Sequence, residues 1–165
     1  MNGKILIACI GNIFFGDDAF GVEIAKRLAD SPLPQDVVVR DFGIRSYDLA
    51  YTLMKHWDLV ILVDALPAGG KPGTLYAFEP EPPAENAIPP SVDAHSLSPD
   101  SVLQLVQALG GKVGRLLVVG CEPESVEPNQ HGEMGLSPHV RAAMDEAVRM
   151  IQDLVARASS QAMAA

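Results

Sequence analysis

The chain has 165 residues, 48% of them hydrophobic, and a formal net charge of −9. A chain of this length and composition can bury a full core as one domain, which argues against a disordered protein. The negative charge argues against a nucleic-acid partner and an anionic membrane surface, and favours a metal ion or a cationic peptide segment. No run approaches the roughly 20 apolar residues of a membrane span, and the N-terminal apolar run lacks a cleavage signal. We therefore expect a soluble cytoplasmic protein.

Five short apolar runs predict strands, and segments with helical spacing of apolar residues separate most of them. The runs cover residues 4–10, 37–42, 57–65, 74–78 and 115–120. The run at 57–65 is almost continuous in apolar residues, as expected for a strand that is covered on both faces. We therefore expect an α/β fold, a three-layer sandwich with a mainly parallel five-stranded sheet and helices on both faces.

One predicted strand does not fit the parallel arrangement. Residues 74–78 follow the preceding strand through a short link that carries turn signals at Gly69-Gly70 and Pro72-Gly73 and no helix. Large sheets often carry one antiparallel strand at an edge. We expect residues 74–78 to form such an antiparallel edge strand.

Two predicted helices have clear starts. Ser98 and Pro99 form the N-cap and first helical position of one, and Ser137-Pro138 opens the last. The last helix is expected to end near Ala156, because the segment after it has nothing to bury. We therefore expect one domain over residues 1–157 and a frayed tail over residues 158–165.

An acidic pair follows the first predicted strand. Asp17 and Asp18 stand just before a helical pattern that begins at Phe20, so they mark a helix N-terminus. The two carboxylates cannot both cap the helix, because successive side chains at a turn point in different directions. We expect Asp17 to cap the helix and Asp18 to face a cleft.

Two further carboxylates stand at predicted strand ends, where open α/β sheets place their ligand sites. Asp41 ends the second strand and Asp64 ends the third. Asp64 follows a run of four aliphatic residues, so its side chain emerges from the driest part of the protein. Such a carboxylate is normally paired, protonated or bound to a metal, because an unpaired one costs several kcal/mol. The alternative is that Asp64 caps the turn that follows it.

His95 lies between a proline-rich segment and the helix that Ser98 opens. A lone histidine in a loop is more often a surface residue than a ligand. Two carboxylates and one imidazole, however, suit a borderline divalent ion such as zinc or nickel and leave coordination positions open. The residues alone therefore leave His95 open, either as a surface residue or as a third ligand beside Asp18 and Asp64.

Several other chemistries lack their motifs. The glycines after the first strand do not form GxGxxG, the turn has no P-loop lysine, and GxSxG is missing. With no CxxC in the sequence, Cys9 and Cys121 are expected to be buried free thiols in a reducing compartment.

Four segments together resemble the nickel–iron hydrogenase maturation proteases, which trim the C-terminus of the hydrogenase large subunit. They read GNIFFGDDAFGVEIAKRL, LVDALPAGGKPGTL, DAHSLSPDSVLQL, and VVGCEPESVEP followed by GLSPHVRAAMDEAV. The segments occur in the family's order and spacing and cover most of residues 3 to 155. The resemblance implies an endopeptidase that removes the C-terminal extension of a large-subunit precursor after nickel insertion.

The resemblance also assigns roles to residues. It implies that Asp18, Asp64 and His95 are metal ligands and that Asp41 lies beside the cleft as a candidate base or positioning group. The segment after Asp41 departs from the family's small glycine- and threonine-rich turn, since it contains Arg45. Gly43 and Arg45 are therefore candidates for contact with the precursor.

The resemblance further implies that the nickel belongs to the substrate and that the protein has no tightly bound resident metal. The expected partner is the C-terminal segment of the precursor. We expect a monomer, because docking on a large precursor needs a free cleft edge. Two alternatives remain at this point: a non-catalytic maturation chaperone that recognises the nickel-loaded subunit, and a hydrolase that holds its own zinc.

Overall fold

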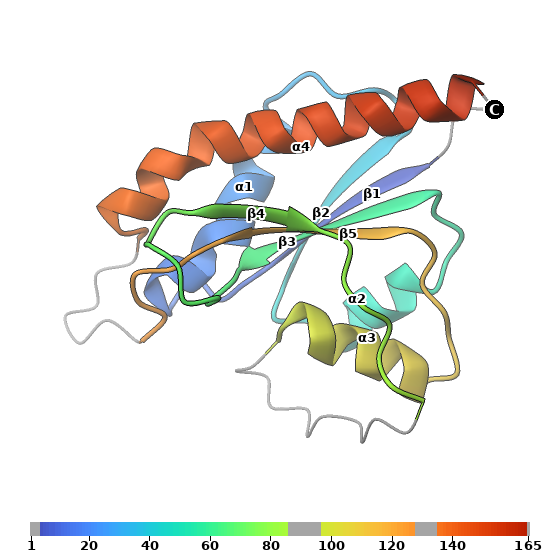
Figure 1. Cartoon of the computed structure of the whole chain (residues 1–165), viewed down its shortest axis with the longest axis horizontal. Coiled ribbons are helices and arrows are strands. Elements are labelled where there is room, and N and C mark those ends of the chain that lie inside the picture. Colours follow the sequence, from blue (N-terminus) through green and yellow to red (C-terminus); the bar gives the residue numbers. More distant parts are fainter. Residues whose placement is uncertain (1–3, 86–96, 128–134, 165) are drawn as a thin grey trace.

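The computed structural model describes residues 4–85, 97–127 and 135–164. Five strands form one sheet in the order β2-β1-β3-β5-β4 (Figure 1). They are β1 (Ile5–Ile10), β2 (Val37–Gly43), β3 (Leu59–Ala65), β4 (Leu75–Phe78) and β5 (Leu116–Cys121). All neighbours are parallel except β4, which pairs antiparallel with β5. The predicted mainly parallel sheet with an antiparallel edge strand is confirmed.

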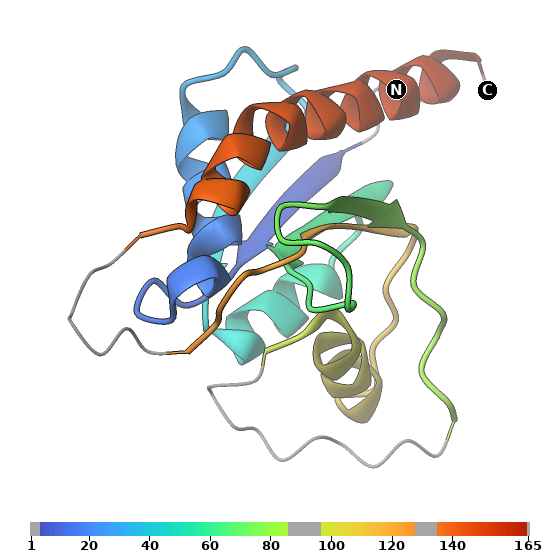
Figure 2. The same ribbon diagram turned by 60° about the vertical axis from the view of Figure 1, so that its left-hand side comes forward.

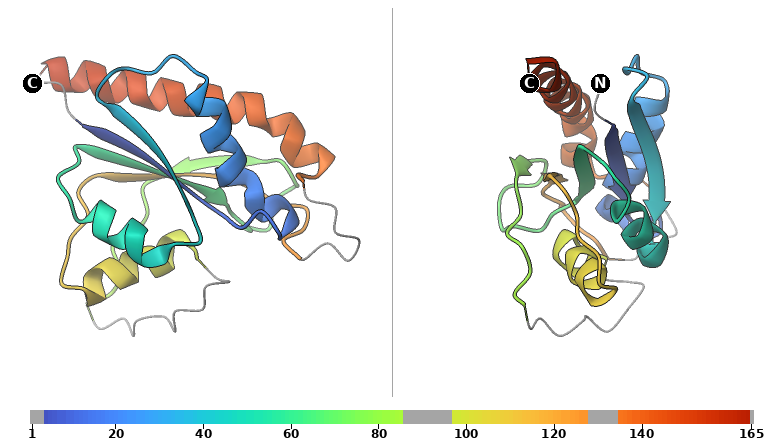
Figure 3. Two further views of the ribbon diagram at one scale, coloured as in Figure 1. Left: turned by 180° about the vertical axis from the view of Figure 1, so that it is seen from behind. Right: turned by 90° about the vertical axis from the view of Figure 1, so that its right-hand side faces the viewer.

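Helices cover both faces of the sheet (Figures 1 and 3). The helical elements are a 3₁₀ turn η1 (Gly16–Ala19), α1 (Phe20–Ala29), α2 (Ser46–Leu53), α3 (Pro99–Ala108) and α4 (Pro138–Ala164). Helices α1 and α4 pack on one face and α2 and α3 on the other, so the sheet separates two apolar cores.

β3 shows why the central strands are so apolar. Its residues are buried from end to end. Ile61 and Val63 point into the core under α1 and α4, whereas Val60 and Leu62 point into the core under α2 and α3. Because the side chains alternate between two dry faces, the strand has no polar face and its sequence shows no alternation.

The start of α3 follows the expected capping chemistry. The Ser98 hydroxyl accepts a hydrogen bond from the Ser101 backbone N–H at 3.2 Å, and the Ser98 N–H donates to the Ser101 hydroxyl at 2.8 Å. Pro99 occupies the first turn, where its missing N–H has no cost. The predicted cap is confirmed.

The predicted end of the last helix was wrong, because α4 continues past Ala156 to Ala164. Residues 157–164 contain neither glycine nor proline, and they are rich in strong helix formers. Val155 still packs in the core, and Gln161 accepts a hydrogen bond from Arg115 at 3.1 Å. The fraying of residues 158–165 stays a prediction.

Within the described part of the chain, every helix is too short or too polar to cross a membrane.

Gly21 lies in the first turn of α1, where the helix crosses the strand ends. A Cβ atom there would lie 2.1 Å from the Ile10 carbonyl oxygen and 2.6 Å from that of Val63. Both contacts are with backbone, so a rotamer change cannot relieve them. We predict that Gly21→Ala lowers the free energy of unfolding, measured by urea denaturation, by about 1–3 kcal/mol. Ala29→Ser, which adds one atom at the exposed end of α1, should change it by less than about 0.5 kcal/mol. Equal midpoints for the two variants would contradict this close packing.

Candidate active site

The turn after β1 brings the first carboxylate over the strand ends. At Gly11, where φ is +152°, a Cβ atom would lie 2.0 Å from the Asp18 carbonyl oxygen. Only glycine lets the chain fold back this closely. The Asn12 side-chain oxygen accepts a hydrogen bond from Phe14 N–H at 2.9 Å, which closes the turn between them.

Asp18 lies in η1 and is half-buried at the end of β1. Its Oδ2 accepts a hydrogen bond from the Asn12 N–H at 2.9 Å. Burial raises the pKa of Asp18 above its usual value, and the Asn12 hydrogen bond offsets only part of this rise. The side chain is thus held in place but poorly solvated.

Asp64 is the last residue but one of β3, and only 3% of its surface is exposed. Its Oδ1 is buried and has no hydrogen-bond partner among the residues that the structure describes. Burial raises the pKa of Asp64 well above its usual value, and the nearby charge of Asp18 raises it further. The structure therefore brings Asp18 and Asp64 close together in a poorly solvated place at the strand ends.

Asp17 does not cap α1, contrary to our expectation. The residue before α1 is Ala19, which makes no side-chain cap. The buried Asp17 carboxylate accepts hydrogen bonds from the Ser137 N–H at 2.7 Å, the Ser137 hydroxyl at 2.8 Å and the Glu124 N–H at 2.8 Å. It therefore joins η1 to the segment after β5 and to the start of α4, which lie side by side in Figure 2. Three tertiary donors satisfy this carboxylate better than one helix end could.

Asp41 lies near the end of β2, which is beside β1 in the sheet. Its Oδ1 accepts a hydrogen bond from the Gly43 N–H at 2.8 Å, and the side chain is largely exposed. Gly43 has φ +55° and its carbonyl oxygen accepts from the Gly11 N–H at 3.0 Å. The turns that contain Gly11 and Gly43 are thus hydrogen-bonded to each other, and Asp41 lies at the same end of the strands as Asp18.

Arg45 folds back on the end of β2. Its Nε donates to the Phe42 carbonyl oxygen at 3.0 Å, and its guanidinium also donates to the Asp41 carbonyl oxygen. Asp48 lies 3.7 Å from the guanidinium. The exposed cation therefore stiffens the turn that carries Asp41, and its role in substrate contact stays a prediction.

His95, the third expected ligand, lies outside the described residues. Among the residues that the structure describes, no group of three His, Cys, Asp or Glu side chains could hold a metal ion. Asp18 and Asp64 lie near each other, and the binding of a metal ion by these two residues and His95 stays a prediction.

Sequence reasoning missed Glu122, which follows β5 and is buried. Its carboxylate accepts hydrogen bonds from the Ala68 N–H at 2.8 Å, the Gly69 N–H at 3.1 Å and the Tyr76 hydroxyl at 2.9 Å. Burial alone would raise the pKa of Glu122, but these hydrogen bonds outweigh it and hold the pKa below its usual value. Glu122 therefore fixes the loop after Asp64. The sequence did contain a signal for Glu122, namely a carboxylate next to an apolar strand. Glu122 directly follows β5, just as Asp64 lies near the end of β3.

The two cysteines are free and buried, as expected. Burial and the charge of Asp41 raise the pKa of Cys9, and burial with nearby carboxylates raises the pKa of Cys121 to about 12. Both thiols are therefore protonated at neutral pH, and neither is an activated nucleophile.

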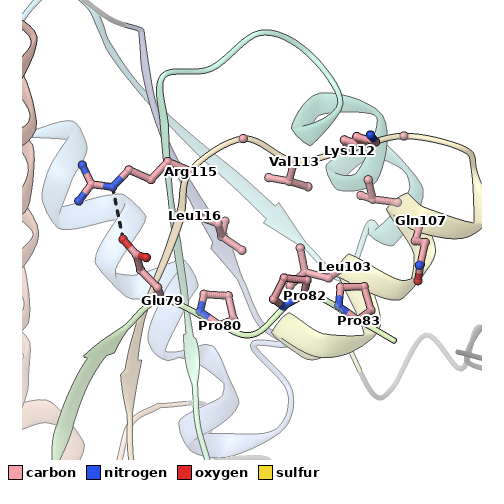
Figure 4. Close-up of a pocket in the computed structure, with 13 residues that line it drawn as sticks. Glu79, Pro80, Pro82, Pro83, Leu103, Gln107, Lys112, Val113, Arg115 and Leu116 are labelled. Carbon is pink, nitrogen blue, oxygen red and sulfur yellow. Dashed lines mark hydrogen bonds and ion pairs between the residues drawn. The ribbon is translucent and has the colours of Figure 1, made fainter. Parts of the chain in front are cut away.

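An apolar hollow of about 440 Å³ lies at the opposite end of the sheet from these carboxylates (Figure 4). It lies between the proline-rich segment after β4, helix α3 and the start of β5, and its lining includes Pro80, Pro82, Pro83, Leu103, Val106 and Leu116. The ion pair between Arg115 and Glu79, at 3.4 Å, lies at its side. None of the titratable groups with a shifted pKa lines it, so we place the chemistry at the strand ends.

A sequence model of hydrogenase maturation proteases matches residues 22–154. The chain belongs to the hydrogenase maturation protease family. Membership confirms the resemblance seen in the sequence and favours an endopeptidase over a non-catalytic chaperone.

Individual relatives agree over nearly the whole length. The coenzyme F420 hydrogenase subunit delta of Methanothermobacter thermautotrophicus is 33% identical over 158 residues, covering 92% of this chain and 94% of the relative. The hydrogenase 2 maturation protease of Escherichia coli is 33% identical over 153 residues, covering 90% and 88%. The solved structure of the hydrogenase maturating endopeptidase HybD from E. coli is 28% identical with a TM-score of 0.73, covering 93% of each chain.

The shifted pKa of Asp64 predicts a pH-dependent stability. The protonated form is favoured in the folded protein, so its contribution to stability is fully present below pH 3.8 and is lost as pH rises through the raised folded-state pKa. Asp64→Asn has no such loss. We predict that, in chelator-treated protein, this variant gains unfolding free energy relative to wild type as pH rises from about 4 to about 8.

Asp153→Asn on the exposed side of α4 is the matched control, and its difference from wild type should stay nearly constant over the same range. Urea denaturation at several pH values measures both differences. The same profile for the two variants would contradict an uncompensated buried carboxylate at position 64.

Proposed function

We propose that this protein is an endopeptidase that removes the C-terminal extension of a nickel–iron hydrogenase large-subunit precursor after nickel insertion. Family membership supports the reaction class. The observation that supports the role of nickel is the buried Oδ1 of Asp64 beside Asp18, which has no hydrogen-bond partner among the described residues. Two carboxylates with raised pKa values, held close together, bind a divalent cation at the expense of protons.

We propose that this cation is the nickel that the precursor carries. Two carboxylates and the imidazole of His95 provide at most three ligands, and borderline divalent ions accept this donor set. The remaining positions are then available to ligands from the precursor. Recognition of the metal would make the site a checkpoint, because a precursor without nickel offers nothing for Asp18, Asp64 and His95 to bind.

The chain's own residues would hold and orient the precursor. A bound divalent ion can polarise the scissile carbonyl or orient a water molecule. Asp41 is exposed at the neighbouring strand end, which suits a base or a positioning group at the rim of the site. Gly43 and Arg45 belong to the turn that carries Asp41. Because this turn lies at the rim of the site, both residues are proposed to contact the precursor.

Three further properties belong to the same proposal. The protein acts as a monomer in the cytoplasm, where its two buried thiols remain reduced. It holds no tightly bound metal of its own between reactions. Metal analysis of protein purified without chelator tests this last point, since a resident hydrolytic zinc would appear at about one ion per chain.

We predict that wild-type protein cuts nickel-loaded precursor and leaves nickel-free precursor intact. Asp64→Asn and His95→Ala should each lower the cleavage rate by at least about 100-fold, because even residues that only support metal ligands are typically worth 10- to 100-fold. Gel analysis of purified precursor measures the loss of the short C-terminal peptide.

The matched controls are Asp30→Asn and His56→Ala, which alter an exposed carboxylate and an exposed imidazole. Both should cleave at nearly the wild-type rate. Wild-type cleavage by His95→Ala would remove His95 from the site, and equal cleavage of nickel-free precursor would end the checkpoint proposal.

A further inference from the structure

The sheet has an open edge at β4. This strand is last in the strand order and pairs with β5. The Glu122 N–H donates a hydrogen bond to the Thr74 carbonyl oxygen at 2.8 Å, so the peptide group of Thr74 points toward the chain of β5. By alternation, the peptide groups of Tyr76 point toward β5, and those of Leu75 and Ala77 point away from it. Within the described part of the chain, no strand pairs with this outer side.

The sequence of β4 does not block pairing at this edge. The strand reads LYAF and contains no proline, lysine or inward charge, which are the usual means by which proteins protect an edge strand. Ala77 and Phe78 are exposed. The outer side of β4 can therefore accept hydrogen bonds from, and donate them to, one more short strand.

A hollow of about 400 Å³ lies along this edge, between Ala77 and α4. Its other lining residues are Glu146, Arg149, Met150, Asp153, Leu154 and Arg157. No residue of β5 lines it, so it lies on the open side of β4. With Ala77, three apolar side chains and four charged ones form its wall, and in the described residues none of these four charged side chains belongs to an ion pair.

We propose that the outer edge of β4 binds the C-terminal extension of the precursor as an added strand. This inference rests on the proposed function. The peptide groups of Leu75 and Ala77 would hold the extension by backbone hydrogen bonds, and alternate side chains of the extension would enter the hollow beside α4. The mixed wall suits side chains that have an aliphatic stem and a charged end. The stem can lie on Met150 and Leu154, and the charged end can reach Arg149, which forms no ion pair in the described residues.

The register of the sheet places this edge within reach of the candidate active site. Asp64 lies opposite Gly120, and Gly120 lies opposite Tyr76. An added strand is three strand spacings from β3, or about 14 Å, which about four extended residues can span. An extension that starts at the Asp18–Asp64 site can therefore lie along β4 from about its fifth residue onward.

Ala77→Pro tests the proposal, because it removes an outward N–H without removing a hydrogen bond between β4 and β5. We expect KM for nickel-loaded precursor to rise about tenfold while kcat stays within about twofold. Ala77→Ser keeps the N–H and should raise KM much less than Ala77→Pro does. An unchanged KM for a folded Ala77→Pro variant would overturn the proposal.

A shortened precursor identifies what the edge binds. With an extension cut to three residues, wild type should show the raised KM and Ala77→Pro should raise it no further. Additive effects would overturn the proposal, because the edge would then bind something other than the extension. Failure of the proposed function itself is distinct, since wild type would then cleave neither precursor.

Hydrogen exchange gives a test that does not depend on the folding of a variant. A synthetic extension peptide should slow exchange of the Leu75 and Ala77 amides in wild-type protein and leave exchange of the Lys26 and Arg27 amides in α1 unchanged. Unchanged exchange at both β4 amides would overturn the proposal. So would a wild-type dimer that Ala77→Pro converts to monomer with no change in KM, because the edge would then pair with a second copy.

Discussion

The close approach of the turn after β1 and of α1 to the strand ends is the constraint on which the candidate site depends. At Gly11 and Gly21 a side chain would overlap backbone atoms of η1, β1 or β3. Because both residues are glycines without side chains, η1 can lie over the ends of the strands. Asp18 therefore comes near Asp64, at a place where neither carboxylate is well solvated. The pair is unfavourable when both groups are ionised and no cation is present. We propose that this cost makes the site responsive to a metal ion brought by the precursor.

Two other buried carboxylates hold the surroundings of that pair in place. Asp17 fastens η1 to the segment after β5 and to the start of α4. Glu122 fastens the loop after β3 to the sheet through three donors. Neither side chain has to move for chemistry, because each already has its hydrogen-bond partners. A rigid frame of satisfied carboxylates thus surrounds the one carboxylate oxygen, Oδ1 of Asp64, that lacks a partner in the described residues. Such a contrast is typical of sites that are organised before the ligand arrives.

The sequence predicted the strands and helices that depend on local residue patterns. It did not predict side-chain roles that depend on hydrogen-bond partners far away along the chain. The continuous apolar runs gave the sheet, and the position of Asp64 after such a run gave its burial. The role of Asp17 could not be predicted, because its partner Ser137 is 120 residues away and local rules favour a helix cap. Helix α4 extends beyond its predicted end because residues 157–164 have high helix propensity, although they bury little. The joining of Asp18 to Asp64 and His95 came from the family resemblance and not from spacing.

The proposed checkpoint requires that Asp18 and Asp64 bind nickel which the precursor carries. X-ray absorption at the nickel edge tests this directly, with nickel-loaded precursor measured alone and after mixing with the protein. We expect mixing to add oxygen or nitrogen ligands to the nickel, and Asp64→Asn to diminish this change. A nickel spectrum that stays the same on mixing, while wild-type protein still removes the extension, would contradict the claim.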